Sequence, residues 1–205
     1  MINIKSNIDE VIKQISIAKK EQIPYAISLA VNETAQDIAT EVTEQMPRFI
    51  DRPTPFTLKA YLSASGKWKG KRANKRDLTA IIQAGEIQAE YLAFQVYGGT
   101  RKPKKTAILV PTLKAPKNQY GNLSRANLKK YAEPSGKLFH AGKKENKEPG
   151  VYRNNRRTIE MLAAYELETQ YEARFPIHKI AEAKARQVIE RNVYRSIQKA
   201  LQSAR

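Results

Sequence analysis

The sequence predicts an α+β fold: an antiparallel sheet of β-hairpins packed by N-terminal helices and a long C-terminal helix, with long extended loops. Apolar side chains recur at helical spacing near both ends of the chain. Between these ends, apolar and polar residues alternate in pairs of short segments, which indicates antiparallel strands placed between helices. The 205 residues are predicted to form a single domain, organised as segments 1–46, 47–114, 115–150 and 151–205.

Segment 1–46 is predicted to be helical. In Asn7–Gln22 the apolar side chains recur every three or four residues, at Ile8, Val11, Ile12, Ile15 and Ala18. A second helix is predicted from Pro24 to Met46, because proline suits the first turn of a helix and Pro47 stops it. The buried stripe of this second helix is formed by Ile27, Ala30, Val31, Thr34, Ile38 and Val42.

Segment 47–114 begins with an elbow. Two prolines within three residues force an extended, rigid chain, and the elbow is formed by Asp51, Arg52, Pro53, Pro55 and Phe56. A β-hairpin follows, with strands at Thr57–Ala64 and Leu78–Ala84 and a turn at Gly66–Arg76. The turn has no acid and six cations: Lys67, Lys69, Lys71, Arg72, Lys75 and Arg76. We expect this tip to be exposed, so that charge reversal there leaves the fold intact.

The rest of the chain continues the mixture of helices and strands. The elements predicted after residue 89 are a helix at Glu90–Tyr97, strands at Ala107–Pro111, Val151–Tyr152 and Ile159–Leu167, a weak helix at Ser124–Tyr131 and a final helix at Ile177–Ser203. Gly98 and Gly99 are predicted to stop the helix before them, because glycine commonly follows a helix C-terminus. The stripe of the final helix is formed by Ile177, Ala181, Ala185, Val188, Ile189, Val193, Ile197 and Leu201.

Positive charge is the strongest functional signal. The chain has 37 Lys and Arg against 20 Asp and Glu, a net charge of +17, which favours a polyanionic partner such as nucleic acid. The cations are spread over loops and one helix face, a pattern that suits attraction to phosphates more than reading of bases. The candidate contacts to DNA or to neighbouring subunits are Lys67, Trp68, Lys69, Lys71, Arg72, Lys75, Arg76, Arg101, Lys102, Lys104, Lys105, Arg153, Arg156 and Arg157. Trp68 either stacks on a base or packs on its own hairpin or in a subunit interface.

Catalytic patterns are weak. The absence of cysteine excludes disulfides, thiolate zinc sites and a cysteine nucleophile, and both histidines lack a neighbouring carboxylate at ligand spacing. Two groups of acids could hold a divalent cation, but a solvated helical face is the preferred interpretation of the first; the groups are Glu33, Asp37, Glu41 and Glu44, and Glu160, Glu166 and Glu168. We therefore predict a protein that is not an enzyme, has no cofactor or metal and does not cross a membrane.

Several motifs resemble those of a tailed-phage and prophage family. The segment Asp51–Thr57 matches the family pattern Asp-Arg-Pro-Thr-Pro-Phe/Tyr-Thr, within "MPRFIDRPTPFTLKAYL", and it follows the helical "AVNETAQDIATEV". The stretch "YLAFQVYGGTRKPK" is similar to a second family element, and "YGNLSRANLKKY", "EPGVYR" and the closing helix also fit. More distantly, the first and last helices resemble the minor tail protein Z group, the tail-completion proteins of lambda-like phages.

The resemblance implies a virion structural protein, made in the host bacterial cytoplasm and located at the head–tail junction or in the upper tail. It implies a ring of identical subunits, by analogy a hexamer, that contacts neighbouring neck or tail proteins and surrounds packaged double-stranded DNA. Two alternatives remain open from the residues: a free nucleic-acid-binding protein without sequence preference, and a metal-dependent nuclease that uses Glu166 and Glu168.

Overall fold

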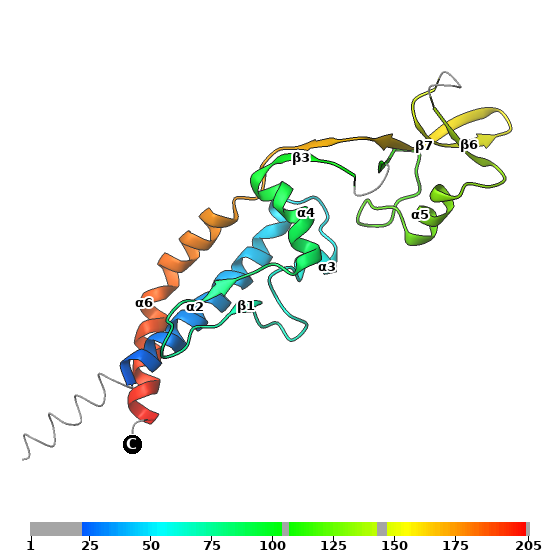
Figure 1. Ribbon diagram of the computed structural model, residues 1–205. Coiled ribbons are helices and arrows are strands. Elements are labelled where there is room, and N and C mark those ends of the chain that lie inside the picture. The colour runs from blue at the N-terminus through cyan, green and yellow to red at the C-terminus, as the bar shows by residue number, and fades with distance from the viewer. Residues whose placement is uncertain (1–21, 104–106, 143–146, 204–205) are drawn as a thin grey trace, which may run out of the picture. The chain divides into compact units, whose positions relative to one another are not determined.

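The computed structural model describes residues 22–103, 107–142 and 147–203 (Figure 1). The predicted helix Asn7–Gln22 lies, except for Gln22, outside the described residues. The α+β class is confirmed, because helices are combined with antiparallel strands throughout the described chain. The contacts divide the chain into two compact units: unit 1 draws on Met1–Met46, Pro55–Ala89 and Pro176–Arg205, and unit 2 is Pro47–Thr54 with Glu90–Phe175. Only the boundary at Met46 coincides with a predicted segment boundary.

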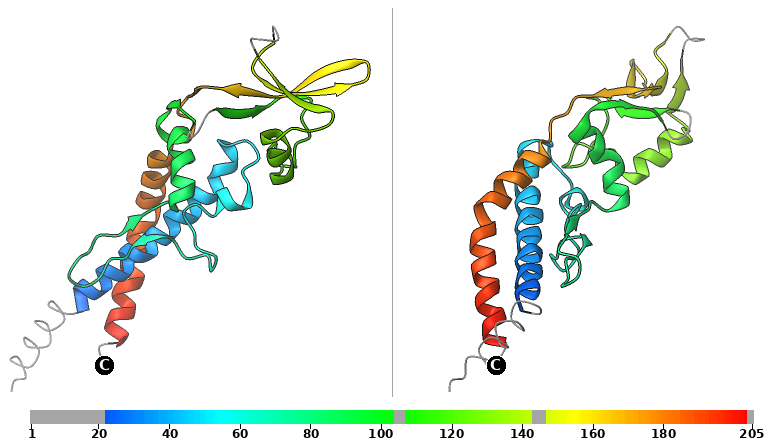
Figure 2. Two further views of the ribbon diagram at one scale, coloured as in Figure 1. Left: turned by 45° about the vertical axis from the view of Figure 1, so that its right-hand side comes forward. Right: turned by 60° about the vertical axis from the view of Figure 1, so that its left-hand side comes forward.

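Unit 1 is built on two long helices that lie side by side (Figure 2). They are α2 (Ile23–Gln45) and α6 (Ile177–Ser203), close to their predicted bounds. The side of α6 that faces α2 is buried at four-residue steps, at Val188, Asn192, Ser196 and Ala200. Most of these side chains are small or polar, as are the fully buried Ala30 and Ala39 of α2. The predicted stripe of α6 is therefore only partly right, because Ile197 and Leu201 are exposed.

The chain after the elbow differs from the prediction. Thr57–Ala64 is not a strand: Pro55–Leu58 forms a one-turn helix, α3, and Leu62 makes only an isolated bridge to Trp68. Proline at the first helical position explains the change, because its fixed φ is preset for a helix and its missing N–H costs nothing there. The hairpin is reduced to β1 (Gly70–Lys71) and β2 (Ile81–Ile82), which pair antiparallel.

Gly98 ends the next helix, α4 (Glu86–Tyr97), as predicted. Its φ is 71°, and its N–H donates to the carbonyl oxygen of Phe94 at 3.0 Å. Gly99 has a different role, because it begins β3 (Gly99–Arg101), which pairs antiparallel with β8 (Thr169–Tyr171).

Unit 2 contains a four-stranded antiparallel sheet of order β4-β7-β6-β5; its strands β6 and β7 are labelled in Figure 1. Its strands are β4 (Ile108–Pro111), β5 (Leu138–Ala141), β6 (Gly150–Asn155) and β7 (Thr158–Glu166). The core joins Val151, Leu162 and Ala163 of the sheet to Tyr131 of α5 (Arg125–Ala132). The predicted connection 115–150 contains the predicted weak helix, as α5, and also the strand β5, which was not predicted. Leu138 of β5 packs against this core. None of the described helices combines the length and hydrophobicity that a bilayer crossing requires.

Candidate nucleic-acid interface

Two lysines of the predicted cationic tip serve the local structure of unit 1. The Nζ atom of Lys69 donates to the carbonyl oxygens of Lys59 at 2.8 Å and Ala60 at 3.2 Å. Lys71 lies within β1 and forms an ion pair with Asp77, and this hydrogen bond holds the pKa of Asp77 below its usual value. These two lysines are partly exposed, but their ammonium groups have partners within unit 1: two carbonyl oxygens for Lys69 and the Asp77 carboxylate for Lys71.

Trp68 is buried rather than presented to solvent. Only 6% of the residue is exposed, and its backbone N–H donates to Gln36 Oε1 of α2 at 3.0 Å. The guanidinium carbon of Arg72 lies 5.8 Å from the Trp68 ring centroid, and Lys75 Nζ lies 5.4 Å from that of Tyr25. The base-stacking interpretation of Trp68 is therefore wrong for this fold, and the packing alternative describes the side chain.

Four further predicted cations, Lys67, Arg76, Arg101 and Lys102, are exposed. Lys67 and Arg76 have no ion-pair partner within the described ranges. Arg101 and Lys102 are exposed at the end of β3, whereas Lys104 and Lys105 lie outside the described residues.

The elbow bends sharply at Arg52. Its φ is 44°, in the left-handed region, and its guanidinium donates to both carboxylate oxygens of Asp51, with a shortest distance of 2.8 Å. This hydrogen bond lowers the pKa of Asp51. The predicted extended elbow is therefore limited to Pro53 and Thr54, because Pro55 and the half-exposed Phe56 already belong to α3.

Arg153 is the one cation of the predicted basic turn 153–157 that lies in strand β6, which runs on to Asn155. Its Nη2 donates to Glu160 Oε2 of β7 at 2.8 Å, and Asn155 Nδ2 donates to the same oxygen at 3.0 Å. The hydrogen bond from Arg153 holds the pKa of Glu160 below its usual value. Glu160 thus balances the charge of Arg153, which removes both residues from the candidates for anion and metal binding.

The end of the β6–β7 hairpin is different. Asn155 pairs with Thr158, so Arg156 and Arg157 form the two-residue turn. An open concavity of about 510 Å³ lies there, lined by Lys137, Asn155, Arg156, Arg157 and Thr158. We call these five residues the hairpin tip. It contains three cations and no acid, and neither arginine has an ion-pair partner among the residues that the structure describes.

Lys137 is the cation of the hairpin tip that the sequence did not indicate. It precedes β5, and its carbonyl oxygen accepts a hydrogen bond from the Asn154 N–H at 2.8 Å. The pairing of β5 with β6 therefore brings Lys137 to the turn. Guanidinium groups match phosphate oxygens through paired hydrogen bonds, and the lysine ammonium adds a point charge. The hairpin tip therefore has the chemistry of a site for phosphate groups.

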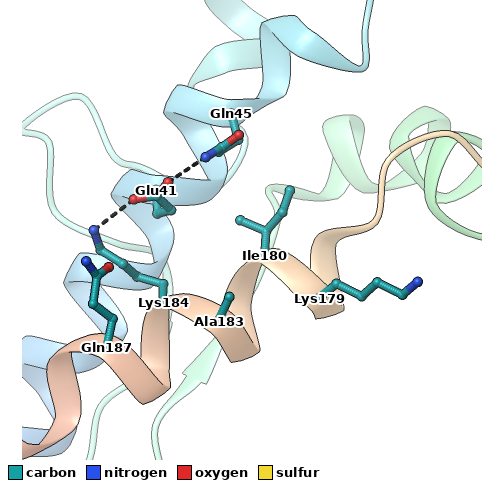
Figure 3. Close-up of a pocket in the computed structure, with 7 residues that line it drawn as sticks. All are labelled: Glu41, Gln45, Lys179, Ile180, Ala183, Lys184 and Gln187. Atoms are coloured by element: carbon teal, nitrogen blue, oxygen red, sulfur yellow. Dashed lines mark hydrogen bonds and ion pairs between the residues drawn. The ribbon is translucent and has the colours of Figure 1, made fainter.

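A second concavity, between α2 and α6, is shown in Figure 3. It has a volume of about 350 Å³, and Ile180 and Ala183 form its apolar wall. Its only acid, Glu41, accepts hydrogen bonds from Lys184 Nζ at 2.8 Å and from Gln45 Nε2 at 2.7 Å. The single carboxylate among the residues that line this groove is therefore engaged in contacts within unit 1.

In comparisons with known proteins, no family model matches this chain, and no curated protein or solved structure shows significant similarity to it. The resemblance to phage tail proteins therefore stays a prediction from the sequence motifs.

The acids of α2 have a structural role that the sequence did not reveal. Glu33 pairs with Lys199 of α6 at 2.6 Å, and Asp37 pairs with Arg191 at 3.0 Å. Together with Glu41 they form three ion pairs between the helices, so the interpretation as a solvated face is wrong for these three acids. The fourth acid, Glu44, is exposed, as that interpretation predicts. Within the described ranges, no cluster of three or more histidine or acidic side chains is arranged to hold a metal ion.

Proposed function

We propose that this chain is a structural protein of a tailed-phage particle, located at the head–tail junction or in the upper tail, where copies form a ring around the DNA channel. In this role the hairpin tip contacts DNA phosphates without reading bases. The observation that carries the proposal is the concentration of cations without ion-pair partners at this tip, while Glu33, Asp37, Glu41 and Glu160 are engaged in ion pairs. The family motifs in the sequence support the same conclusion.

Exposed apolar side chains favour a protein of an assembly over a free nucleic-acid-binding protein. Leu113, in the turn after β4, is 95% exposed, and Leu167, after β7, is 74% exposed. Single exposed leucines are common on protein surfaces, but in an assembly these two can anchor contacts with neighbouring proteins. Such contacts are expected with a second copy, a connector, a tail terminator or a tail tube.

DNA binding at graded salt tests the role of the hairpin tip. We expect wild-type chain to bind duplex DNA weakly, with log K falling linearly as log salt rises. Arg156→Gln with Arg157→Gln should reduce that slope by about 2, since each lost phosphate contact removes about 0.9. The matched control is Lys67→Gln with Arg76→Gln, which removes the same charge from unit 1 and should retain the slope. Equal slopes in both variants would show that the tip is not the contact.

The particle itself tests the location. Mass spectrometry of purified phage particles whose genome encodes this chain should detect it at the copy number of a ring. Absence from the particles, combined with tight DNA binding at physiological salt, would overturn the structural role in favour of a free nucleic-acid-binding protein.

A further inference from the structure

The β6–β7 hairpin extends past the other two strands of its sheet. Strand β4 pairs with β7 no closer to the turn than Ala163, and β5 pairs with β6 no closer than Arg153. Beyond these positions β6 and β7 are paired with each other for two further residue pairs, apart from one hydrogen bond from Asn154 to Lys137. The end of the hairpin is therefore a two-stranded ribbon that closes in the Arg156–Arg157 turn, and its yellow end extends beyond the other strands in the left view of Figure 2.

The turn of this ribbon presents two adjacent guanidinium groups to solvent. Arg156 and Arg157 are both exposed, and neither pairs with an acid of the described chain. Their Cα atoms lie about 3.8 Å apart, the spacing across a trans peptide bond. Lys137 lies beside them at the same concavity. Both guanidinium groups can therefore enter one narrow space, with an ammonium group at its edge.

We propose that the hairpin tip binds duplex DNA at the minor groove, with Arg156 and Arg157 between the two rows of phosphates and Lys137 on one row. This inference rests on the proposed contact of the hairpin tip with DNA, and it adds the groove. The contact is sensitive to the shape of the duplex, because A·T-rich DNA has a narrower minor groove with a more negative potential. A·T-rich duplexes are therefore expected to bind more tightly than G·C-rich ones, although no base edge is read.

An acid below the turn limits how far the hairpin can enter a groove. Glu160 Oε2 accepts hydrogen bonds from Asn155 at 3.0 Å and from Arg153 at 2.8 Å, so a carboxylate lies one hydrogen bond away from the hairpin tip. The major groove, about 12 Å wide, admits a whole two-stranded ribbon. Phosphates on both sides of such a ribbon would repel the carboxylate of Glu160 and compete for Arg153. The minor groove, about 6 Å wide, admits the arginine side chains and leaves the strands outside, so contact by the turn alone favours it.

The identity of the cations fits the same groove. A guanidinium group is more weakly hydrated than an ammonium group, so it loses less free energy when it leaves bulk water for a narrow groove. The negative potential of a narrow minor groove attracts inserted arginine side chains. The strongly hydrated ammonium group of a lysine suits phosphates at the rim, which agrees with the position of Lys137 beside the turn. Lysine in place of Arg156 and Arg157 should therefore keep the charge and lose the preference for shape.

Binding to two duplexes of equal length tests this inference. The full-length chain is titrated onto an A-tract duplex and a G·C duplex at the same low salt concentration, with fluorescence anisotropy as the readout. We expect the wild type to bind the A-tract roughly fivefold more tightly. Arg156→Lys with Arg157→Lys should make the two affinities nearly equal and leave the salt dependence on the G·C duplex unchanged. The control is Arg76→Lys with Arg101→Lys, at exposed positions elsewhere in the chain, and it should keep the wild-type ratio.

Netropsin, a small molecule that occupies the minor groove of A·T-rich DNA, provides a second readout. It should lower the affinity of the wild type for the A-tract duplex to that for the G·C duplex, and binding to the G·C duplex should not change. Equal wild-type affinities for the two duplexes, or a preference that survives netropsin or the lysine substitutions, would refute the groove assignment and leave the proposed function standing. An unchanged salt slope in Arg156→Gln with Arg157→Gln would remove both this inference and the proposed contact of the hairpin tip with DNA.

Discussion

Lys184 of α6 donates a hydrogen bond to Glu41 of α2 at 2.8 Å, although 143 residues separate them in the sequence. Both side chains are less than one quarter exposed, at 24% and 22%. This pair shows that the acidic face of α2 is an interface between helices. Glu33 and Asp37 of the same helix are likewise paired with cations of α6.

The Glu41–Lys184 pair should contribute measurably to the stability of unit 1. A double-mutant cycle with Glu41→Ala and Lys184→Ala is expected to yield a coupling energy of about 1 kcal/mol, the upper end for partly exposed pairs. The control is the exposed pair of Glu182 and Arg186 within α6, for which we expect less than about 0.5 kcal/mol. Urea unfolding measures both cycles, and equal coupling energies would contradict the interface role of Glu41.

Asn192 should be essential to the contact between α2 and α6. It is 1% exposed, and its Nδ2 donates to Thr34 Oγ1 at 3.2 Å and to Asp37 Oδ2 at 3.0 Å. Asn192→Ala leaves both acceptors without this donor, so we expect the free energy of unfolding to fall by about 1 to 3 kcal/mol. Exposed Gln198→Ala on the same helix is the control and should change stability little. A neutral Asn192→Ala would show that the two acceptors are satisfied by other groups.

Gly150 is required by close packing within the sheet of unit 2. A Cβ atom added there would lie 2.4 Å from the carbonyl oxygen of Ala163 on β7, so the strands would have to move apart. Gly150→Ala is expected to destabilise unit 2 by about 1 to 3 kcal/mol. At Gly142 the nearest heavy atom to an added Cβ is 3.9 Å away, so Gly142→Ala should be tolerated. Similar thermal unfolding of the two variants would refute the packing argument.

Acid should weaken the β6–β7 hairpin through Glu160. Its pKa is lowered in the fold, chiefly by the hydrogen bond from Arg153. A lowered carboxyl pKa stabilises the fold above the ordinary value of about 4.5, and this stabilisation is lost as the pH falls through the folded-state pKa. Glu160→Gln should therefore reduce the loss of stability between neutral pH and pH 3. Denaturant unfolding at each pH measures this, and parallel pH profiles for variant and wild type would exclude the effect.

Lys69 and Lys71, whose ammonium groups have partners, should contribute more to the free energy of unfolding than the exposed Lys67 and Arg76. Lys69→Glu with Lys71→Glu removes the bonds to two carbonyl oxygens and the ion pair with Asp77, so we expect a loss of about 1 to 3 kcal/mol. Because Lys69 and Lys71 have these partners, the expected result differs from the sequence-based one, in which charge reversal in the turn Gly66–Arg76 leaves the fold intact. Lys67→Glu with Arg76→Glu changes the same charge at exposed sites and should unfold like wild type in urea. Equal losses of stability in the two double variants would show that the change in net charge, and not the loss of these contacts, causes the effect.

Local periodicity predicted some elements closely and others poorly. The bounds of α6, Ile177–Ser203, agree with the prediction, because 3.6-residue spacing over many turns is a strong signal. The predicted strand at Thr57–Ala64 was wrong, since alternation over eight residues competed with the helix-starting preference of Pro55. The strand β5 was missed because it is recognisable only by its pairing with β6.

The amino-acid sequence by itself determined the α+β class, the two long helices, the helix stop at Gly98 and the surplus of positive charge. These properties depend on residues within a few positions of each other, where backbone geometry and side-chain spacing act directly. Only the tertiary structure decided which charges remain unpaired: it brings Lys137 to Arg156 and Arg157, and it places Glu41 beside Lys184. Such pairings depend on how distant segments reverse and align, which no local pattern of residues specifies.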